Sequence, residues 1–315
     1  MTKFAFIFPG QGSQFIGMGK DLADTFASAK AVFEEVDGAL GQDLSGLIWS
    51  GSEDELKLTA NTQPALMAVS VAAMRALEEA HGIGADKAAF IAGHSLGEYS
   101  ALASAGAISV GDCAKVLRVR GNAMQDAVPA GEGAMAALLG ASPEQAAALC
   151  AAGASEGPCE IANDNAPGQI VISGAKAAVE LAISGAKEAG VKKAVLLPVS
   201  APFHCSLMQP AADAMAEALS NIEIKAPSAP LVANVTAIAG DDPEAIRAQL
   251  IEQVTGQVRW TESVQYIAAQ GVELTIEAGA GKVLSVMNRR TVRALEGLTM
   301  GTPEDIAAVA ERLNG

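Results

Sequence analysis

The sequence predicts an α/β protein: a mainly parallel β-sheet covered by helices on both faces, with a smaller αβ unit inserted into it. Two observations lead to this fold class. Short apolar segments of strand length alternate with longer segments whose apolar residues recur at helical spacing, a pattern typical of parallel strands joined by crossover helices. Between residues 128 and 199 the order of the expected elements changes, which indicates an insertion.

The first 127 residues contain the expected start of the main sheet. Residues 4–8 are continuously apolar and end in the glycine turn PGQGSQ. Residues 62–82 form the strongest helical pattern, because Pro64 stands near its start and Gly82 follows its end. In chain order we expect a strand at 4–8, a helix at 17–39, a helix at 62–82, a strand at 88–93 followed directly by a helix, and a helix at 110–128.

The inserted segment has a pattern of its own. We expect, in order, a strand ending near 140, a helix at 142–153, two strands within 159–174, a helix at 175–190 and a strand at 191–200. This βαββαβ order is that of a ferredoxin-like unit, so we expect a small domain at 128–199. The residues 1–127 and 200–315 then form the large domain. Its pattern resumes with a helix at 207–220, a strand at 229–235, a helix at 264–271 and a strand at 272–279.

The composition narrows the class of protein. Half of the 315 residues are hydrophobic but only 4% are aromatic, so we expect a large core of small and branched aliphatic residues. The formal net charge of −15 argues against a nucleic-acid partner. The opening residues lack a signal-peptide core, and no apolar run reaches the roughly 18 residues of a membrane helix. We therefore expect a cytoplasmic protein with no membrane partner. The net charge of −15 also fits a monomer, which is the oligomeric state that we expect.

Cofactor and metal motifs are not found. The turn PGQGSQ departs from the dinucleotide fingerprint at Phe15, and the segment AGAGKV near the end lacks the first glycine and the Ser/Thr of a P-loop. No His/Cys/carboxylate cluster has metal-ligand spacing, and the four cysteines show no C-x-x-C pattern. We expect no metal, no bound cofactor, and reduced, mostly buried thiols.

A nucleophile is indicated by the segment AGHSLGEY, in which Ser95 stands between two glycines. The serine follows an expected strand and precedes an expected helix, the context of a G-x-S-x-G nucleophile elbow in an α/β-hydrolase-like core. A second match surrounds Ser155, but it follows a helical segment and precedes Pro158, so we expect a loop there. Ser95 is therefore the candidate nucleophile.

The candidate base comes from a set of three histidines. His94 neighbours Ser95, but adjacent side chains leave an elbow in different directions, so we expect a structural role. His81 ends a surface helix, where a cation suits the helix dipole. His204 follows the last strand of the insertion, at the expected cleft between the domains, and is the best candidate for the general base. No carboxylate between Ser95 and His204 stands convincingly at a strand end, so a backbone carbonyl is one alternative for orienting the imidazole.

Two further features have a possible role in binding. The glycines of PGQGSQ allow backbone N–H groups to converge after a strand, which suits an anion or an oxyanion. Arg120 ends a helical segment just before a glycine. Its side chain is either a solvated surface arginine or a guanidinium that binds a substrate carboxylate, and the residues alone leave both interpretations open.

Six motifs together resemble one enzyme family. In chain order they are PGQGSQ, GHSLGEY, RG..MQ, NAPGQIVISG, FHC.LM and EQVTGQVRW, and they extend over nearly the whole chain. This combination resembles the malonyl-CoA:acyl-carrier-protein transacylases, and it is similar to the acyltransferase domains of polyketide and animal fatty acid synthases. The length resembles that of the stand-alone enzymes of dissociated fatty acid synthesis.

The resemblance implies a role for each matching residue. Ser95 would form the malonyl ester and His204 would be the general base and acid, oriented by the main-chain carbonyl of Gln253. The oxyanion hole and the substrate contacts are implied in the same way: main-chain N–H groups of Gln11 and Leu96, the guanidinium of Arg120 on the malonyl carboxylate, Asn165 lining the site, and Phe203, whose ring would crowd an α-methyl group.

The implied reaction is a ping-pong transfer with two substrates, malonyl-CoA and phosphopantetheinylated acyl carrier protein. Because carrier proteins of this family are acidic and this chain is too, a local basic patch would have to guide docking. Candidates are Arg289, Arg290, Arg293, Lys187, Lys192 and Lys193.

Three alternatives remain open. One is an acyltransferase of polyketide synthesis. Another is a serine thioesterase or hydrolase, although the sequence shows no orienting acid. The last is a carrier-protein-binding module that has lost catalysis.

Overall fold

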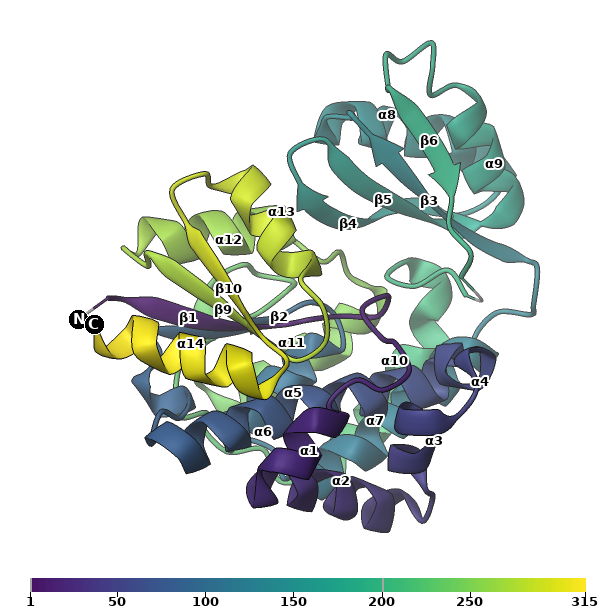
Figure 1. Cartoon of the computed structure of the whole chain (residues 1–315). Helices are drawn as coiled ribbons and strands as arrows, with labels where there is room; N and C mark the ends of the chain where they lie inside the picture. The colour runs from purple at the N-terminus through teal and green to yellow at the C-terminus, as the bar shows by residue number, and fades with distance from the viewer. Residues whose placement is uncertain (1, 200) are drawn as a thin grey trace.

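The computed structural model describes residues 2–199 and 201–315, which form a six-stranded sheet with helices on both faces and a separate four-stranded sheet (Figure 1). The large sheet has the strand order β10-β9-β1-β2-β7-β8, and every neighbouring pair is parallel except β7 and β8. Its strands are β1 (Phe4–Phe8), β2 (Phe90–Gly93), β7 (Leu231–Val232), β8 (Ala239–Gly240), β9 (Leu274–Ala278) and β10 (Glu296–Met300).

Strand β1 shows why the sheet is covered on both faces. Its side chains alternate between two hydrophobic cores, since successive residues of a strand point to opposite faces. Phe4, Phe6 and Phe8 belong to the core that contains α5 (Thr59–His81) and most other helices. Ala5 and Ile7 belong to the core beneath α12 (Trp260–Ala269) and α13 (Val283–Thr291). The continuous apolar run at 4–8 follows from burial on both sides.

The remaining helices of the large unit contribute to the same core as α5, so α12 and α13 cover the other face of the sheet (Figure 1). Those on the α5 side are α1 (Lys20–Thr25), α2 (Ala27–Leu40), α3 (Leu44–Ser50), α4 (Glu53–Lys57), α6 (Gly97–Ser104), α7 (Val110–Asp126), α10 (Gln209–Ser220), α11 (Pro243–Thr255) and α14 (Pro303–Asn314), with the short 3₁₀ turns η1 (Ala85–Lys87) and η3 (Ser206–Met208). The expected single helix at 17–39 is wrong: Phe26 adopts an extended conformation (φ −117°, ψ 125°) and separates α1 from α2.

The segment from 133 to 196 forms the second sheet, which stands apart from the first in Figure 1. Its strands have the order β4-β5-β3-β6, all antiparallel. They are β3 (Gly133–Leu139), β4 (Cys159–Ala166), β5 (Gln169–Ala175) and β6 (Lys193–Leu196), with α8 (Pro143–Gly153), η2 (Ala154–Glu156) and α9 (Lys176–Ser184) between them. The helix expected at 175–190 ends at Ser184. A third apolar core lies between this sheet and its two helices.

The end of β4 joins the small sheet to the large unit. Asn163 pairs with Val258 in a parallel bridge, and main-chain hydrogen bonds run from Asp164 N to Val258 O (3.0 Å) and from Val258 N to Ala162 O (2.8 Å). The hydroxyl of Thr261 donates to the carboxylate of Asp164 at 2.7 Å. This junction holds the small sheet against the segment that follows α11.

Two properties of the described residues bear on the expectations from composition. None of the helices in the described part of the chain combines the length and the apolar character needed to cross a bilayer. The four cysteines are free thiols and are all buried, as expected.

Candidate active site

Ser95 lies at a sharp turn between β2 and α6. The turn puts Ser95 in the left-handed region, with φ at 54°, which is uncommon for a residue with a side chain. The flanking glycines permit it. A Cβ on Gly93 would stand 1.9 Å from the main chain of Gly97, and a Cβ on Gly97 would stand 2.2 Å from the carbonyl oxygen of Phe8. Strand, turn and helix are therefore arranged as the sequence predicts.

His204 reaches Ser95 from a segment 109 residues away. Its Nε2 lies 2.8 Å from the Ser95 Oγ. Its Nδ1 lies 2.9 Å from the main-chain oxygen of Gln253 and 3.2 Å from that of Gly256. Because carbonyls only accept, Nδ1 carries the proton and Nε2 is left as the acceptor for the serine hydroxyl. Backbone carbonyls, rather than a carboxylate, thus orient the imidazole.

Electrostatics keep the imidazole neutral. Burial lowers the pKa of His204 to about 3, and the positive charge of Arg120 acts in the same direction. A neutral imidazole can accept a proton at any pH at which the protein is expected to work.

Arg120, on α7, is buried beside the nucleophile rather than solvated. Its Nη2 donates to the Ser95 Oγ at 3.1 Å and to the side-chain oxygen of Gln253 at 2.8 Å. Its Nη1 donates to the side-chain oxygen of Gln63 at 3.0 Å, and the guanidinium lies 5.6 Å from the ring centre of Tyr99. Burial lowers the pKa of Arg120, but an arginine stays charged at neutral pH.

Three polar residues around the site were not found from the sequence: Gln63, Glu98 and Asn234. Glu98 is completely buried, and its Oε2 accepts from the side-chain nitrogen of Gln253 at 2.5 Å. Asn234 accepts from the Ser95 main-chain N–H at 2.8 Å and donates to the Gly93 carbonyl at 2.6 Å. Asn234, from the segment after β7, thus binds the elbow directly, and Glu98, on the helix that follows Ser95, accepts from the main-chain N–H of Asn234.

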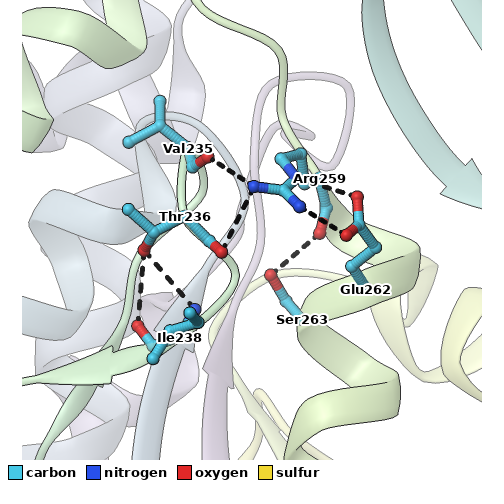
Figure 2. A network of polar contacts seen from close by, with 6 residues as sticks. All are labelled: Val235, Thr236, Ile238, Arg259, Glu262 and Ser263. Carbon is cyan, nitrogen blue, oxygen red and sulfur yellow. Dashed lines mark hydrogen bonds and ion pairs between the residues drawn. The ribbon is translucent and has the colours of Figure 1, made fainter.

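Figure 2 shows how the segment that carries Asn234 is held. The Nη1 of Arg259 donates to the main-chain oxygens of Val235 (3.1 Å) and Thr236 (3.3 Å), while its Nε donates to Glu262 at 2.8 Å. The main-chain N–H of Arg259 also donates to the main-chain oxygen of Asn234 at 3.0 Å. Arg259 thus connects the start of α12 to the loop beneath Ser95.

The turn after β1 packs against the elbow. A Cβ on Gly10 would stand 2.8 Å from the carbonyl oxygen of His94, so only glycine allows the two turns to come this close. In the described part of the chain, the main-chain N–H groups of Gln11 and Leu96 make no hydrogen bond. Both residues line the same cavity as Ser95. Two free donors therefore border the space beside the nucleophile.

The cavity has a volume of about 460 Å³ and lies between the two sheets. Among the predicted site residues, all except Gln253 line it: Gln11, Ser95, Leu96, Arg120, Asn165, Phe203 and His204. The small sheet contributes Asn165, whose Oδ1 lies 2.8 Å from the Nε2 of His94. His94 therefore faces β4 while Ser95 faces His204, which fits the structural role expected for it.

The two alternatives set aside in the sequence lie elsewhere. Ser155 is exposed in the 3₁₀ turn η2, and His81 is exposed at the last residue of α5. Neither borders the cavity. The context of each motif, rather than the motif alone, separated the two serines.

Comparison with known proteins identifies the family. The acyl transferase domain family matches residues 5–308. The malonyl CoA-acyl carrier protein transacylase of Escherichia coli strain K12 is 45% identical over 311 residues, which is 99% of this chain and all of that protein. The crystal structure of an acyl-carrier-protein S-malonyltransferase from Bartonella henselae is 54% identical and superposes with a TM-score of 0.97, covering 100% of both chains.

A third similar protein is a malonyl-transacylase whose structure was solved in complex with a type II polyketide acyl carrier protein. It is 42% identical, with a TM-score of 0.94, and the match covers 99% of this chain and 100% of that one. Full-length matches at this identity, together with the site geometry, leave one assignment: the chain belongs to the acyl transferase family, among the malonyl-CoA:acyl-carrier-protein transacylases.

Proposed function

We propose that the protein transfers the malonyl group of malonyl-CoA to the phosphopantetheine thiol of acyl carrier protein through an ester on Ser95. The observation that carries this proposal is the position of one oxygen. The Ser95 Oγ lies within hydrogen-bond reach of both the His204 Nε2 (2.8 Å) and the Arg120 Nη2 (3.1 Å). A base and a carboxylate-binding cation thus meet at the nucleophile.

The first half-reaction loads the enzyme. The Ser95 oxygen attacks the thioester carbon while its proton moves to the His204 Nε2. The oxyanion that forms faces the free N–H groups of Gln11 and Leu96, and such donors stabilise the transition state more than the ground state. The carbon–sulfur bond then breaks, and the CoA sulfur leaves with the proton from His204.

The second half-reaction runs the same steps with another thiol. The pantetheine thiol of the carrier protein gives its proton to His204 and attacks the malonyl ester. The carbon–oxygen bond to Ser95 breaks, and the serine oxygen takes the proton back. The residues of the chain thereby return to their starting state, so no cofactor is consumed.

Arg120 supplies selectivity for an acyl group that ends in a carboxylate. A guanidinium can donate two parallel hydrogen bonds to a carboxylate. An acetyl group cannot accept them, and a buried charged donor left without a partner costs about 1–3 kcal/mol or more. Phe203 lines the same cavity, where its ring would crowd an α-methyl group, and Asn165 lines it from the small sheet.

The architecture supports two domains with this site between them. We assign residues 1–127 and 200–315 to an α/β-hydrolase-like domain and residues 128–199 to a ferredoxin-like domain. The support is the element order β3-α8-β4-β5-α9-β6 and the separate antiparallel sheet with its own core. The monomeric state and the cytoplasmic location stay predictions.

The pathway follows from the relatives. Stand-alone transacylases of fatty acid synthesis match the whole chain, so we place the enzyme in the supply of malonyl units for fatty acid synthesis. The similarity to a polyketide malonyl-transacylase makes the supply of malonyl units for polyketide synthesis the second candidate.

Intact-mass spectrometry tests the function. Wild type, Ser95→Ala and Arg120→Ala are each mixed with malonyl-CoA or acetyl-CoA, and holo acyl carrier protein is then added. We expect a malonyl adduct that depends on Ser95 and that passes to the carrier protein. An adduct that decays to free malonate with the carrier ignored would mean a hydrolase. No adduct on a folded wild-type protein would mean a carrier-binding module.

A further inference from the structure

Glu98 is a buried carboxylate that the proposed reaction does not use. It lies in the first turn of α6, three residues after Ser95, and its side chain has no exposed surface. Its Oε2 accepts from the Gln253 side chain at 2.5 Å and from the main-chain N–H of Asn234 at 3.4 Å. Its Oε1 has no hydrogen-bond partner in the described part of the chain. Burying a carboxylate costs free energy of folding, so a buried glutamate with an unpaired oxygen indicates a specific role for this side chain.

The amide of Gln253 lies between Glu98 and the reacting groups. Its nitrogen donates to Glu98 and, at 3.0 Å, to the main-chain oxygen of Ser95. Its oxygen accepts from the Arg120 Nη2 at 2.8 Å. The main-chain oxygen of the same residue accepts from the His204 Nδ1 at 2.9 Å. Gln253 therefore contacts the nucleophile, the base and the carboxylate-binding cation at once.

Glu98 determines which way this amide points. An ionised carboxylate only accepts and a guanidinium only donates. With the nitrogen toward Glu98 and the oxygen toward Arg120, both contacts are hydrogen bonds. If the amide turned over, its oxygen would face the carboxylate and its nitrogen would face the guanidinium, so both contacts would be repulsive. The orientation seen is the one that satisfies both neighbours.

We propose that Glu98 is a positioning residue for malonyl loading: through the amide of Gln253 it holds Arg120 and His204 in line with Ser95. The inference rests on the proposed function of the same site. Glu98 touches neither Ser95 Oγ nor the cavity, so its effect on the reaction is transmitted by Gln253.

The charge of Glu98 gives this role a pH dependence. Ionisable groups that interact with Glu98 are Arg120 from α7 and Tyr99 from α6. His204, from the segment before η3, is connected to it only through Gln253. Burial raises the pKa of Glu98 to about 7, against the opposing effects of Gln253, Asn234 and Arg120. The ionised form is the stronger acceptor. The rate of malonyl loading is therefore expected to rise as the pH passes upward through about 7.

A double-mutant cycle tests the transmission through Gln253. The rate of adduct formation with malonyl-CoA is measured in single-turnover experiments for wild type, Glu98→Ala, Gln253→Ala and the double variant. We expect Glu98→Ala to slow loading about 10- to 100-fold in the wild-type background, and by less than about two-fold in the Gln253→Ala background. Equal effects in both backgrounds would overturn the proposal.

Glu98→Gln separates charge from shape. Its side-chain oxygen can still accept from Gln253, so we expect faster loading than in Glu98→Ala together with a loss of the inflection near pH 7. A slow variant that keeps the inflection contradicts the proposal. This nearly isosteric variant also covers the case in which Glu98→Ala does not fold.

Glu277→Gln is the matched control. Glu277 is also a completely buried carboxylate, and it accepts from the main-chain N–H groups of Leu284 (3.0 Å) and Ser285 (2.7 Å), away from Gln253. We expect this variant to load malonyl within about two-fold of wild type and to keep the pH profile. A wild-type protein that forms no adduct would refute the proposed function itself. If the wild type forms the adduct but the effects of Glu98→Ala and Gln253→Ala are additive, only the role of Glu98 is refuted.

Discussion

The Nδ1 of His204 lies 2.9 Å from the main-chain oxygen of Gln253, in the place where the triad of a serine hydrolase has a carboxylate. A carbonyl fixes the tautomer as a carboxylate does, but it brings no negative charge to stabilise an imidazolium. Together with burial and the nearby guanidinium, this explains why the pKa of His204 is lowered rather than raised.

We therefore expect loading to be insensitive to histidine protonation over the usual pH range. A group with a pKa of about 3 is neutral above roughly pH 4, so the base is available throughout. The loading rate is measured from pH 5 to pH 9 in the Glu98→Gln variant, because this variant lacks the carboxylate that titrates near pH 7. A flat profile is expected, and an inflection near 6.5 would contradict it. His204→Ala should lose about 10²- to 10⁴-fold at every pH.

Glu98 is expected to make the folded state less stable at higher pH. Burial raises its pKa from 4.5 to about 7, so between these values the folded state binds the proton more tightly than the unfolded state. Stability is then lost as the pH rises through this window. The free energy of unfolding of Glu98→Gln relative to wild type should increase by about 3 kcal/mol from pH 4.5 to pH 8. Urea denaturation at both pH values measures it, and a constant difference would exclude this effect.

Arg120→Ala should remove the preference for malonyl over acetyl. The malonyl carboxylate would lie in the cavity without its cation. We expect this to raise the free energy of the transition state by about 3 kcal/mol, which lowers kcat/KM for malonyl-CoA about 100-fold. Loading of acetyl should change far less, because acetyl makes no contact with the guanidinium. Arg118→Ala is the control on the same helix, since Arg118 contacts Asn61 (2.7 Å) and Gln42 (2.6 Å) instead of the site. Equal losses for both acyl groups would contradict the assigned role.

Local sequence was enough to find the elbow and its base. Gly93, Ser95 and Gly97 are close in the chain, and the strand and helix on either side have clear patterns. The contact between Ser95 and His204 joins distant segments, but few histidines had to be considered. Glu98 was missed because its partners, Asn234 and Gln253, lie 136 and 155 residues away. One signal was present: Glu98 is the single charged residue in the apolar segment GEYSALASAGAI.

The elements that the sequence analysis missed differ in the strength of their sequence signals. Helices α11 and α14 each begin with a capping side chain followed by proline, Asp242-Pro243 and Thr302-Pro303, a start signal that can be read from sequence. The break at Phe26 has no such signal, because neither glycine nor proline is present and tertiary packing decides the conformation. Strand β10 is half-exposed at the edge of the sheet, so its apolar pattern is weak.

Gly97→Ala should disrupt the elbow. The added Cβ would stand 2.2 Å from the carbonyl oxygen of Phe8, and the central strand cannot move away without disturbing the sheet. We expect a loss of about 3 kcal/mol or more in the free energy of unfolding, with loss of malonyl loading. Gly38→Ala is the control: Gly38 lies in α2 with open space around it, so alanine should stabilise the protein by about 0.5–1 kcal/mol. Similar stability for both variants would contradict the steric argument.

Helix α13 borders the cavity and ends in exposed arginines, which we expect to bind an acidic carrier protein. Val283, Leu284 and Met287 of this helix line the cavity, while Arg289, Arg290 and Arg293 are exposed at and just beyond its end. Reversing the three arginines to Glu should lower kcat/KM for the carrier protein about 10-fold and weaken its salt dependence. Loading from malonyl-pantetheine, which lacks the phosphates of CoA, should stay unchanged. Substitution of Lys187, Lys192 and Lys193 by Glu tests the small unit in the same assay. If only that variant has a lower kcat/KM for the carrier protein, the docking surface lies on the small unit instead.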